Sequence, residues 1–159
     1  MKLRTGIGFD VHQLVPERKL ILGGIEIPHD KGCLAHSDGD VLLHAICDAL
    51  LGAAALGDIG THFPDTDNLY KDIDSRILLE KVCILIKEKG FEICNLDCVV
   101  TLQEPKIKEF IPAIRAEIAG ILKTATDDVS VKATTTEKLG FTGRQEGIAS
   151  WAVVLLSKQ

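Results

Sequence analysis

The chain has 159 residues and a mass of 17.2 kDa, and 46% of its residues are hydrophobic. This is enough to bury one core, so we expect a single domain spanning residues 1–159. Eighteen Lys and Arg against 23 Asp and Glu give a net charge of −5 at pH 7, and no stretch gathers basic residues. The charge balance argues against nucleic acid or an anionic membrane as the partner. A charged content of 26% together with a mean hydropathy of +0.18 excludes a disordered chain.

No segment has the pattern of a targeting or membrane sequence. Gly6 and Gly8 interrupt the N-terminal stretch where a signal peptide needs apolar residues, and the apolar run at 49–56 is too short to span a bilayer. The five cysteines form no C-x-x-C pair, which is typical of reduced thiols. We therefore expect a soluble cytoplasmic protein, with a bacterial source favoured and a mature plastid form left open.

The sequence predicts four long strands and one hairpin, and apolar residues alternate with other residues along two of the strands, at 96–102 and 129–133. The strands fall at residues 3–9, 96–102, 129–133 and 149–156, and the hairpin at residues 20–27 turns at two glycines. The last strand is apolar on both faces.

Apolar residues at helical spacing predict three helices. The first continues to about residue 55 from an N-cap at Ser37 or Asp38, because both side chains are good caps. The second covers about 78–89 and the third about 107–121. The polar segment at 65–74 predicts an exposed, mobile loop.

These elements predict an α/β (α+β) fold. It has a single-layer, mixed four-stranded sheet with helices on one face, in a ferredoxin-like arrangement. No segment is left to cover the other apolar face of the sheet, so we expect a homo-oligomer.

The first candidate site combines Asp10 and His12 with His44. Residues i and i+2 of a strand point to the same side, so Asp10 and His12 emerge together. With His44 they provide the three protein ligands of a catalytic zinc site. In the alternative interpretation, Asp10 caps a turn, His12 is exposed and His44 is a core histidine. Asp48, one turn after His44, either orients a ligand histidine or is a solvated carboxylate.

Two further segments suit phosphate. His36 and Ser37 precede the first helix, where backbone N–H groups attract anions, although they also fit an ordinary loop and cap. Residues 132–144 gather hydroxyls, a carboxylate, cations and glycines, which suits oxyanions and a metal but also a solvated hairpin loop.

Several motifs occur together in a fixed order along the chain. They are GFDVH at 8–12, LAHSDGDV at 34–41 with His44, GDIG at 57–60, FPDTD at 63–67, and KATTTE at 132–137 with the residues up to Arg144. In order and separation they resemble the 2-C-methyl-D-erythritol 2,4-cyclodiphosphate synthase family of the non-mevalonate isoprenoid pathway. The resemblance covers essentially the whole chain.

The resemblance implies a homotrimer with active sites between adjacent subunits, each holding one Zn²⁺ and a second divalent ion, Mg²⁺ or Mn²⁺. The implied reaction cyclises 4-diphosphocytidyl-2-C-methyl-D-erythritol 2-phosphate to the 2,4-cyclodiphosphate and releases CMP. The substrate's own 2-phosphate attacks the β-phosphorus, so the protein supplies alignment and charge neutralisation.

The resemblance also assigns roles to residues. Asp10, His12 and His44 bind zinc, and Glu137 binds the second ion. The implied stabilisers of the transition state are His36 and Thr135. The substrate contacts implied in the first half of the chain are Asp10, His12, His36, Ser37, Asp58, Ile59, Gly60, Phe63, Pro64, Asp65, Thr66 and Asp67. Those in the second half are Leu102, Gln103, Glu104, Pro105, Lys106, Ile107, Lys108, Ala133, Thr134, Thr135, Thr136, Glu137, Phe141 and Arg144.

The resemblance implies that Ser37 contacts a phosphate and that Asp58 with residues 63–67 binds the erythritol part. It implies that residues 102–108 with Ala133 and Thr134 surround the cytosine. It also implies that Phe141 and Arg144 lie near the substrate or the trimer axis, where an isoprenoid diphosphate would bind.

Two other function classes fit the same residues. A metal-dependent phosphohydrolase would use a metal-bound water as the nucleophile and produce a linear product or free phosphate. A non-catalytic trimeric module would bind a nucleotide or isoprenoid phosphate without needing zinc.

Overall fold

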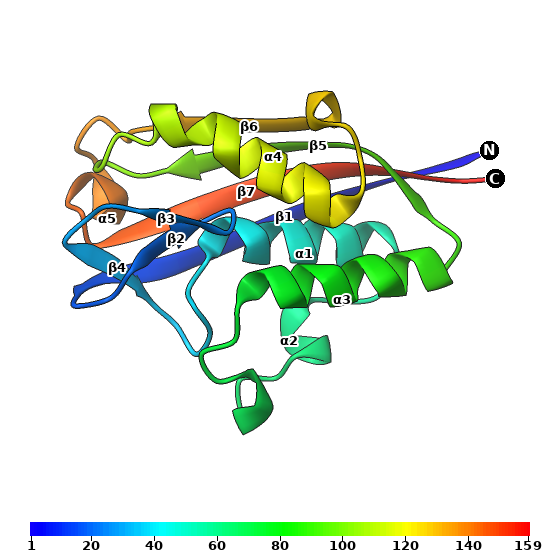
Figure 1. The fold of residues 1–159 in the computed structure, drawn as a ribbon, viewed down its shortest axis with the longest axis horizontal. Helices are drawn as coiled ribbons and strands as arrows, with labels where there is room; N and C mark the ends of the chain where they lie inside the picture. Colours follow the sequence, from blue (N-terminus) through cyan, green and yellow to red (C-terminus); the bar gives the residue numbers. More distant parts are fainter.

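Seven strands form two sheets in the computed structural model, which describes residues 1–159 (Figure 1). The main sheet has the order β4-β1-β7-β5-β6, formed by β4 (Lys31–Leu34), β1 (Lys2–Pro16), β7 (Gly147–Lys158), β5 (Glu92–Thr101) and β6 (Val129–Thr134). Only β5 and β6 pair in parallel, so the sheet is mixed as predicted. Strands β2 (Leu20–Leu22) and β3 (Ile25–Ile27) form the predicted hairpin.

The prediction of four strands in this sheet was wrong, because β4 adds a fifth at the edge. Its four residues pair antiparallel with the end of β1, from Gln13 opposite Leu34 to Pro16 opposite Lys31. So short a strand carries no alternating pattern. The first strand also continues to Pro16 instead of ending at residue 9, so Asp10 and His12 lie within β1.

The three predicted helices are confirmed as α1 (Val41–Ala53), α3 (Ser75–Glu88) and α4 (Ile111–Leu122). The shorter helical turns are α2 (Ile59–His62), η1 (Asn68–Tyr70), η2 (Lys108–Phe110), η3 (Thr126–Asp128) and α5 (Gly140–Gly143). None of the helices has the length and apolar character needed to cross a bilayer.

The N-cap of α1 is Asp40, so the prediction of Ser37 or Asp38 was wrong by two or three residues. The Asp40 carboxylate accepts the N–H groups of Leu42 and Leu43, and also those of Gly23 and Gly24 at the tip of the β2–β3 hairpin. Asp40 is fully buried, and this burial raises its pKa to about 6. One carboxylate thus joins the start of α1 to the hairpin.

Helix α1 lies against β1 at backbone contact. A Cβ atom at Gly8 would lie 1.8 Å from the Ala45 carbonyl oxygen, and one at Gly6 would lie 2.0 Å from that of Ala49. Only glycine at these two strand positions allows this separation. The contact fixes α1 directly over the even-numbered residues of β1.

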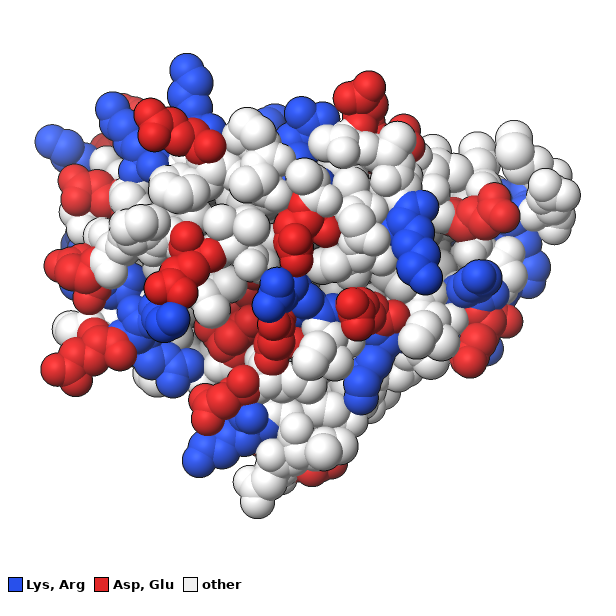
Figure 2. Space-filling view, in the orientation of Figure 1, with Lys and Arg blue, Asp and Glu red and all other residues white.

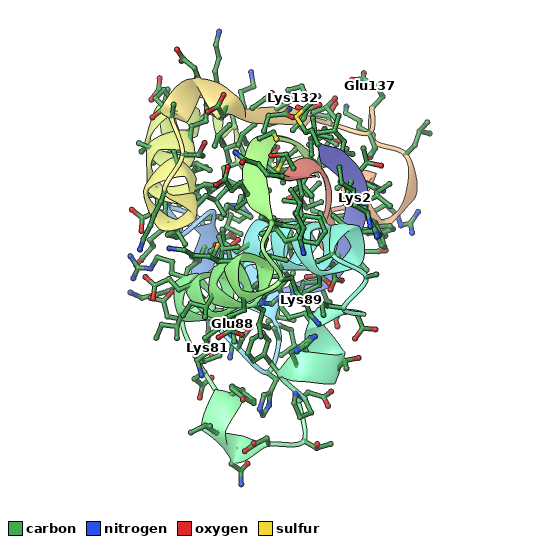
Figure 3. All side chains as sticks on the ribbon, turned by 90° about the vertical axis from the view of Figure 1, so that its right-hand side faces the viewer. Lys2, Lys81, Glu88, Lys89, Lys132 and Glu137 are labelled. Atoms are coloured by element: carbon green, nitrogen blue, oxygen red, sulfur yellow. The ribbon has the colours of Figure 1, made fainter.

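The helices α1, α3 and α4 gather on one side of the main sheet, as predicted (Figures 1 and 3). The opposite side is left open, with Ile7, Phe9 and Val11 of β1 and Val153 of β7 exposed by 43–70%. Figure 2 shows acidic and basic side chains interspersed over the face viewed there, without a large basic patch.

We expect Gly8→Ala to lower the free energy of unfolding by about 1–3 kcal/mol, because the new methyl group meets backbone atoms of α1. The matched control is Gly120→Ala in α4, where a Cβ meets nothing within 4 Å. That change is expected to stabilise the helix by about 0.5–1 kcal/mol. Urea denaturation of both variants measures the difference, and an unchanged midpoint for Gly8→Ala would contradict the packing described.

Candidate active site

Three metal-ligating side chains converge between β1 and α1. Asp10 and His12 point from β1 toward the helix layer, and His44 points from α1 toward β1. Asp10 Oδ2, His12 Nε2 and His44 Nδ1 lie 3.0 Å from one another. Their side chains are 11–24% exposed, so one side of the cluster is open to solvent.

The donor set fits a divalent metal ion. A carboxylate oxygen and two imidazole nitrogens direct lone pairs at one point, and a cation there satisfies all three at once. Three protein ligands leave a fourth position for a substrate oxygen, as in catalytic sites. The structure therefore favours the metal interpretation over that of a turn cap and a core histidine.

The cluster is electrostatically coupled. Partial burial raises the pKa of Asp10, but the hydrogen bonds and charges of His12 and His44 outweigh this effect and bring it down to about 2. Burial lowers the pKa of His44, but the hydrogen bond and charge of Asp10 reverse this, so its pKa is raised above the ordinary value of 6.5. Protons therefore compete with a metal for His44 more strongly than for an ordinary histidine.

The second ring nitrogen of His44 faces away from the cluster. His44 Nε2 lies 2.9 Å from Ser75 Oγ at the start of α3 and 3.1 Å from Ser37 Oγ. Asp48 has a different partner, since its Oδ1 accepts the Ile59 N–H at 2.7 Å. It therefore holds the start of α2 and does not orient a ligand histidine.

The predicted loop at 65–74 is largely exposed, contains the short helix η1, and lies beside the predicted phosphate residues. The backbone of His36 accepts the Asp72 N–H at 2.8 Å, and Asp38 donates its N–H to Ile73 O at 3.1 Å. The His36 ring nitrogen Nε2 is 3.4 Å from Asp67 O.

The predicted erythritol residues lie on α2 and the turn that follows it. Asp58 caps α2 and accepts both the N–H and the hydroxyl of Thr61. Phe63 packs edge-on against Tyr70 with ring centroids 5.5 Å apart. These contacts connect α2 to η1, so Asp58 and residues 63–67 belong to one exposed surface.

A small pocket of about 160 Å³ lies at the ends of β5 and β6. It is lined by Leu102, Gln103, Pro105, Lys106, Ile107, Lys108, Ala133, Thr134 and Thr135. Eight of these nine residues are the ones expected around the cytosine, and the ninth, Thr135, is an expected catalytic residue. Glu104 is absent from the lining.

Glu137 lies on the loop after β6 with a left-handed backbone, and it is outside the three-residue metal cluster. Its Oε1 accepts the Thr135 hydroxyl at 2.8 Å. Figure 3 shows it projecting from the sheet edge near Lys132. Strands β7 and β5 separate β6 from β1, which is about 14 Å at the usual strand spacing. A single chain therefore does not bring Glu137 and the small pocket to the metal cluster.

Phe141 and Arg144 lie on and just after the short helix α5. Phe141 is partly exposed, and Arg144 forms an ion pair with Glu146 at 2.9 Å. Ser75 could not be predicted at the site, because its partner His44 is 31 residues away in the chain. The only feature of the nearby sequence that singles out Ser75 is its position at the start of α3.

We expect the affinity for a divalent metal to rise with pH, because His44 must release a proton before Nδ1 binds the metal. Below the raised pKa of His44, the dissociation constant should increase about tenfold per pH unit for that one proton. Asp10 stays ionised throughout this range. Chelator competition between about pH 6 and pH 8 measures the slope, and a pH-independent affinity would rule out His44 as a ligand.

Comparison with known proteins gives one consistent result. The YgbB family model matches residues 3–157. The 2-C-methyl-D-erythritol 2,4-cyclodiphosphate synthase of Bacillus mycoides (strain KBAB4) is 59% identical over 156 residues, which cover 98% of this chain and 99% of that protein.

Two solved structures are similar in fold over 99% of this chain. Bifunctional IspDF from Campylobacter jejuni has a TM-score of 0.96 at 47% identity, and the match covers 43% of its longer chain. The IspF of Plasmodium falciparum, solved as a CDP complex, has a TM-score of 0.87 at 37% identity, with 97% of its chain covered. The chain therefore belongs to the YgbB family, with 2-C-methyl-D-erythritol 2,4-cyclodiphosphate synthases among its relatives.

Proposed function

We propose that this chain converts 4-diphosphocytidyl-2-C-methyl-D-erythritol 2-phosphate to 2-C-methyl-D-erythritol 2,4-cyclodiphosphate and CMP. The observation that carries the proposal is the full-length match to synthases of that name, at 59% identity, by a chain with a three-donor metal cluster. The CDP complex of the Plasmodium relative supports a cytidine nucleotide as the ligand.

The reaction needs no nucleophile from the protein. An oxygen of the substrate's 2-phosphate forms a bond to the β-phosphorus, and the bond from that phosphorus to the bridging oxygen breaks. CMP leaves with the bridging oxygen. The protein's contribution is to align the two phosphates and to neutralise their charge.

Asp10, His12 and His44 would hold Zn²⁺, and Glu137 would help to hold Mg²⁺ or Mn²⁺. When bound, these ions supply Lewis-acid neutralisation of the phosphate oxygens. Ser37 contacts His44 of the cluster, and with its neighbour His36 it would orient the phosphates. Thr135, which is hydrogen-bonded to Glu137, would contact the phosphates from the nucleotide side.

The substrate's two ends would bind at separate surfaces. Asp58 and residues 63–67 form the exposed surface next to His36, which suits the hydroxyl groups of the erythritol. The pocket of about 160 Å³ at residues 102–108 suits the cytosine ring. Closure of the 65–74 loop over the erythritol would keep water from the β-phosphorus.

The complete site would form between subunits of a homotrimer. Two observations support this arrangement: the cluster and the nucleotide pocket lie three strands apart, and one sheet face exposes apolar side chains. Packing that face against other copies would bring the pocket of one subunit to the cluster of the next. Arg144 and Phe141 would then bind an isoprenoid diphosphate at the trimer axis, after Arg144 exchanges Glu146 for the phosphate.

The reaction is tested by ³¹P NMR of the protein with the proposed substrate, Zn²⁺ and Mg²⁺. We expect CMP and a cyclic diphosphate from the parent, and more than ~100-fold slower turnover from His44→Ala, because it lacks a metal ligand. His29→Ala, a histidine outside the site, should retain the activity. Free phosphate or a linear product would point to a phosphohydrolase instead.

The assembly is tested by sedimentation of Ile7→Glu. Ile7 is 70% exposed on the open sheet face, so a charge there should dissociate the trimer and abolish activity. The control is Ile84→Glu on α3, which is 57% exposed away from this face and should leave the trimer intact. An active Ile7→Glu trimer would contradict the proposed interface.

A further inference from the structure

The outer nitrogen of His44 has two hydroxyl partners, and the proposed chemistry leaves one of them, Ser75, without a role. Ser75 Oγ is 2.9 Å from Nε2, and Ser37 Oγ is 3.1 Å from it. Ser75 is completely buried, and His44 and Ser37 are each more than nine-tenths buried. Solvent therefore cannot replace a hydroxyl that is removed from this position.

Asp38 determines the direction of the hydrogen bonds. Its Oδ1 accepts the Ser75 hydroxyl proton, and its Oδ2 accepts the Ser75 backbone N–H at 3.0 Å. Because an ionised carboxylate only accepts, the Ser75 oxygen has only lone pairs left for His44. The His44 Nε2 must then carry a hydrogen and donate it to Ser75, which leaves the Nδ1 lone pair for the cluster.

Ser37 does not determine whether His44 Nε2 donates or accepts a hydrogen bond. Its oxygen accepts the Gly39 N–H at 3.3 Å, and no carboxylate takes its hydroxyl proton, so it can donate or accept toward His44. Ser37 is also the residue that the proposed function places on a substrate phosphate. When it turns to the phosphate, Ser75 is the remaining partner of Nε2.

We propose that Ser75 and Asp38 are positioning residues that orient His44 and present its Nδ1 to the metal. The inference rests on the proposed metal site and adds two residues to it. Asp38 also donates its N–H to Ile73 O within the 65–74 loop, so the same pair connects that loop to His44. Outer partners of this kind fix the tautomer and ring orientation of a ligand histidine.

The test measures zinc affinity by chelator competition for the parent, Ser75→Ala and Asp38→Asn. We expect Ser75→Ala to bind zinc about 10–100-fold more weakly, the usual effect of losing an outer hydrogen-bond partner. Asp38→Asn keeps the Ser75 hydroxyl but removes the carboxylate that directs it, so its affinity should fall in the same direction. The matched control is Ser150→Ala, another completely buried serine, whose hydroxyl donates to Val99 O.

A second readout separates positioning from a general loss of stability. In the zinc-loaded parent, the buried Nε2 proton of His44 should exchange slowly and give a resolved ¹H NMR signal. Ser75→Ala should lose that signal, and Ser150→Ala should keep it even if its unfolding free energy is lower.

The outcomes distinguish this inference from the proposed function. Folded Ser75→Ala that binds zinc as tightly as the parent and keeps the Nε2 proton signal would overturn the positioning role and leave the proposed reaction standing. A parent protein that binds no zinc would overturn both.

Discussion

The contact between the backbones of α1 and β1 determines the position of the candidate site. Gly6 and Gly8 leave no side chain on the strand, so the carbonyl groups of α1 lie where a Cβ atom would otherwise be. His44 is next to Ala45 at this contact, and Asp10 follows Gly8 by two residues on the same face of β1. A wider separation would pull the imidazole away from the carboxylate. Gly6 and Gly8 therefore influence the metal cluster indirectly, because they determine how close α1 and His44 lie to β1.

Two aspartates at the start of α1 secure this placement in different ways. Asp40 is the N-cap and also accepts the N–H groups of the β2–β3 hairpin, so it sets where the helix begins. Asp38 reaches instead to Ser75 at the start of α3, and through it to the outer nitrogen of His44. The segment before α1 thus joins the hairpin, the 65–74 loop and the metal cluster.

Local patterns predicted much of this structure and failed where partners lie far apart in sequence. Alternation and helical spacing identified the long strands, the three helices and the shared face of Asp10 and His12. The strand β4 was missed because four residues form no pattern without their partner. The cap of α1 was misplaced because Ser37, Asp38 and Asp40 are all good caps, and only the tertiary contacts of Asp40 select among them.

In the candidate site, too, local patterns predicted some features, and contacts between residues far apart in sequence determine the others. The convergence of Asp10 and His12 could be predicted because the strand period brings them to one face, whereas Ser75 meets His44 only through the packing of α3 on α1. The placement of the small pocket three strands from the cluster depends on strand order, which no local pattern contains. The resemblance to a family indicated the residues of the metal cluster and those of the pocket at 102–108. It did not indicate how far apart these two sites lie within one chain.

In the proposed arrangement, one chain provides the metal ligands and a neighbouring chain provides the nucleotide pocket. A crystal structure of the protein with Zn²⁺ and CDP, with data collected at the zinc absorption edge, would test this arrangement. We expect a zinc peak between Asp10, His12 and His44, with the cytosine in the 102–108 pocket of the adjacent subunit. Zinc bound elsewhere, or CDP bound within one isolated chain, would contradict it.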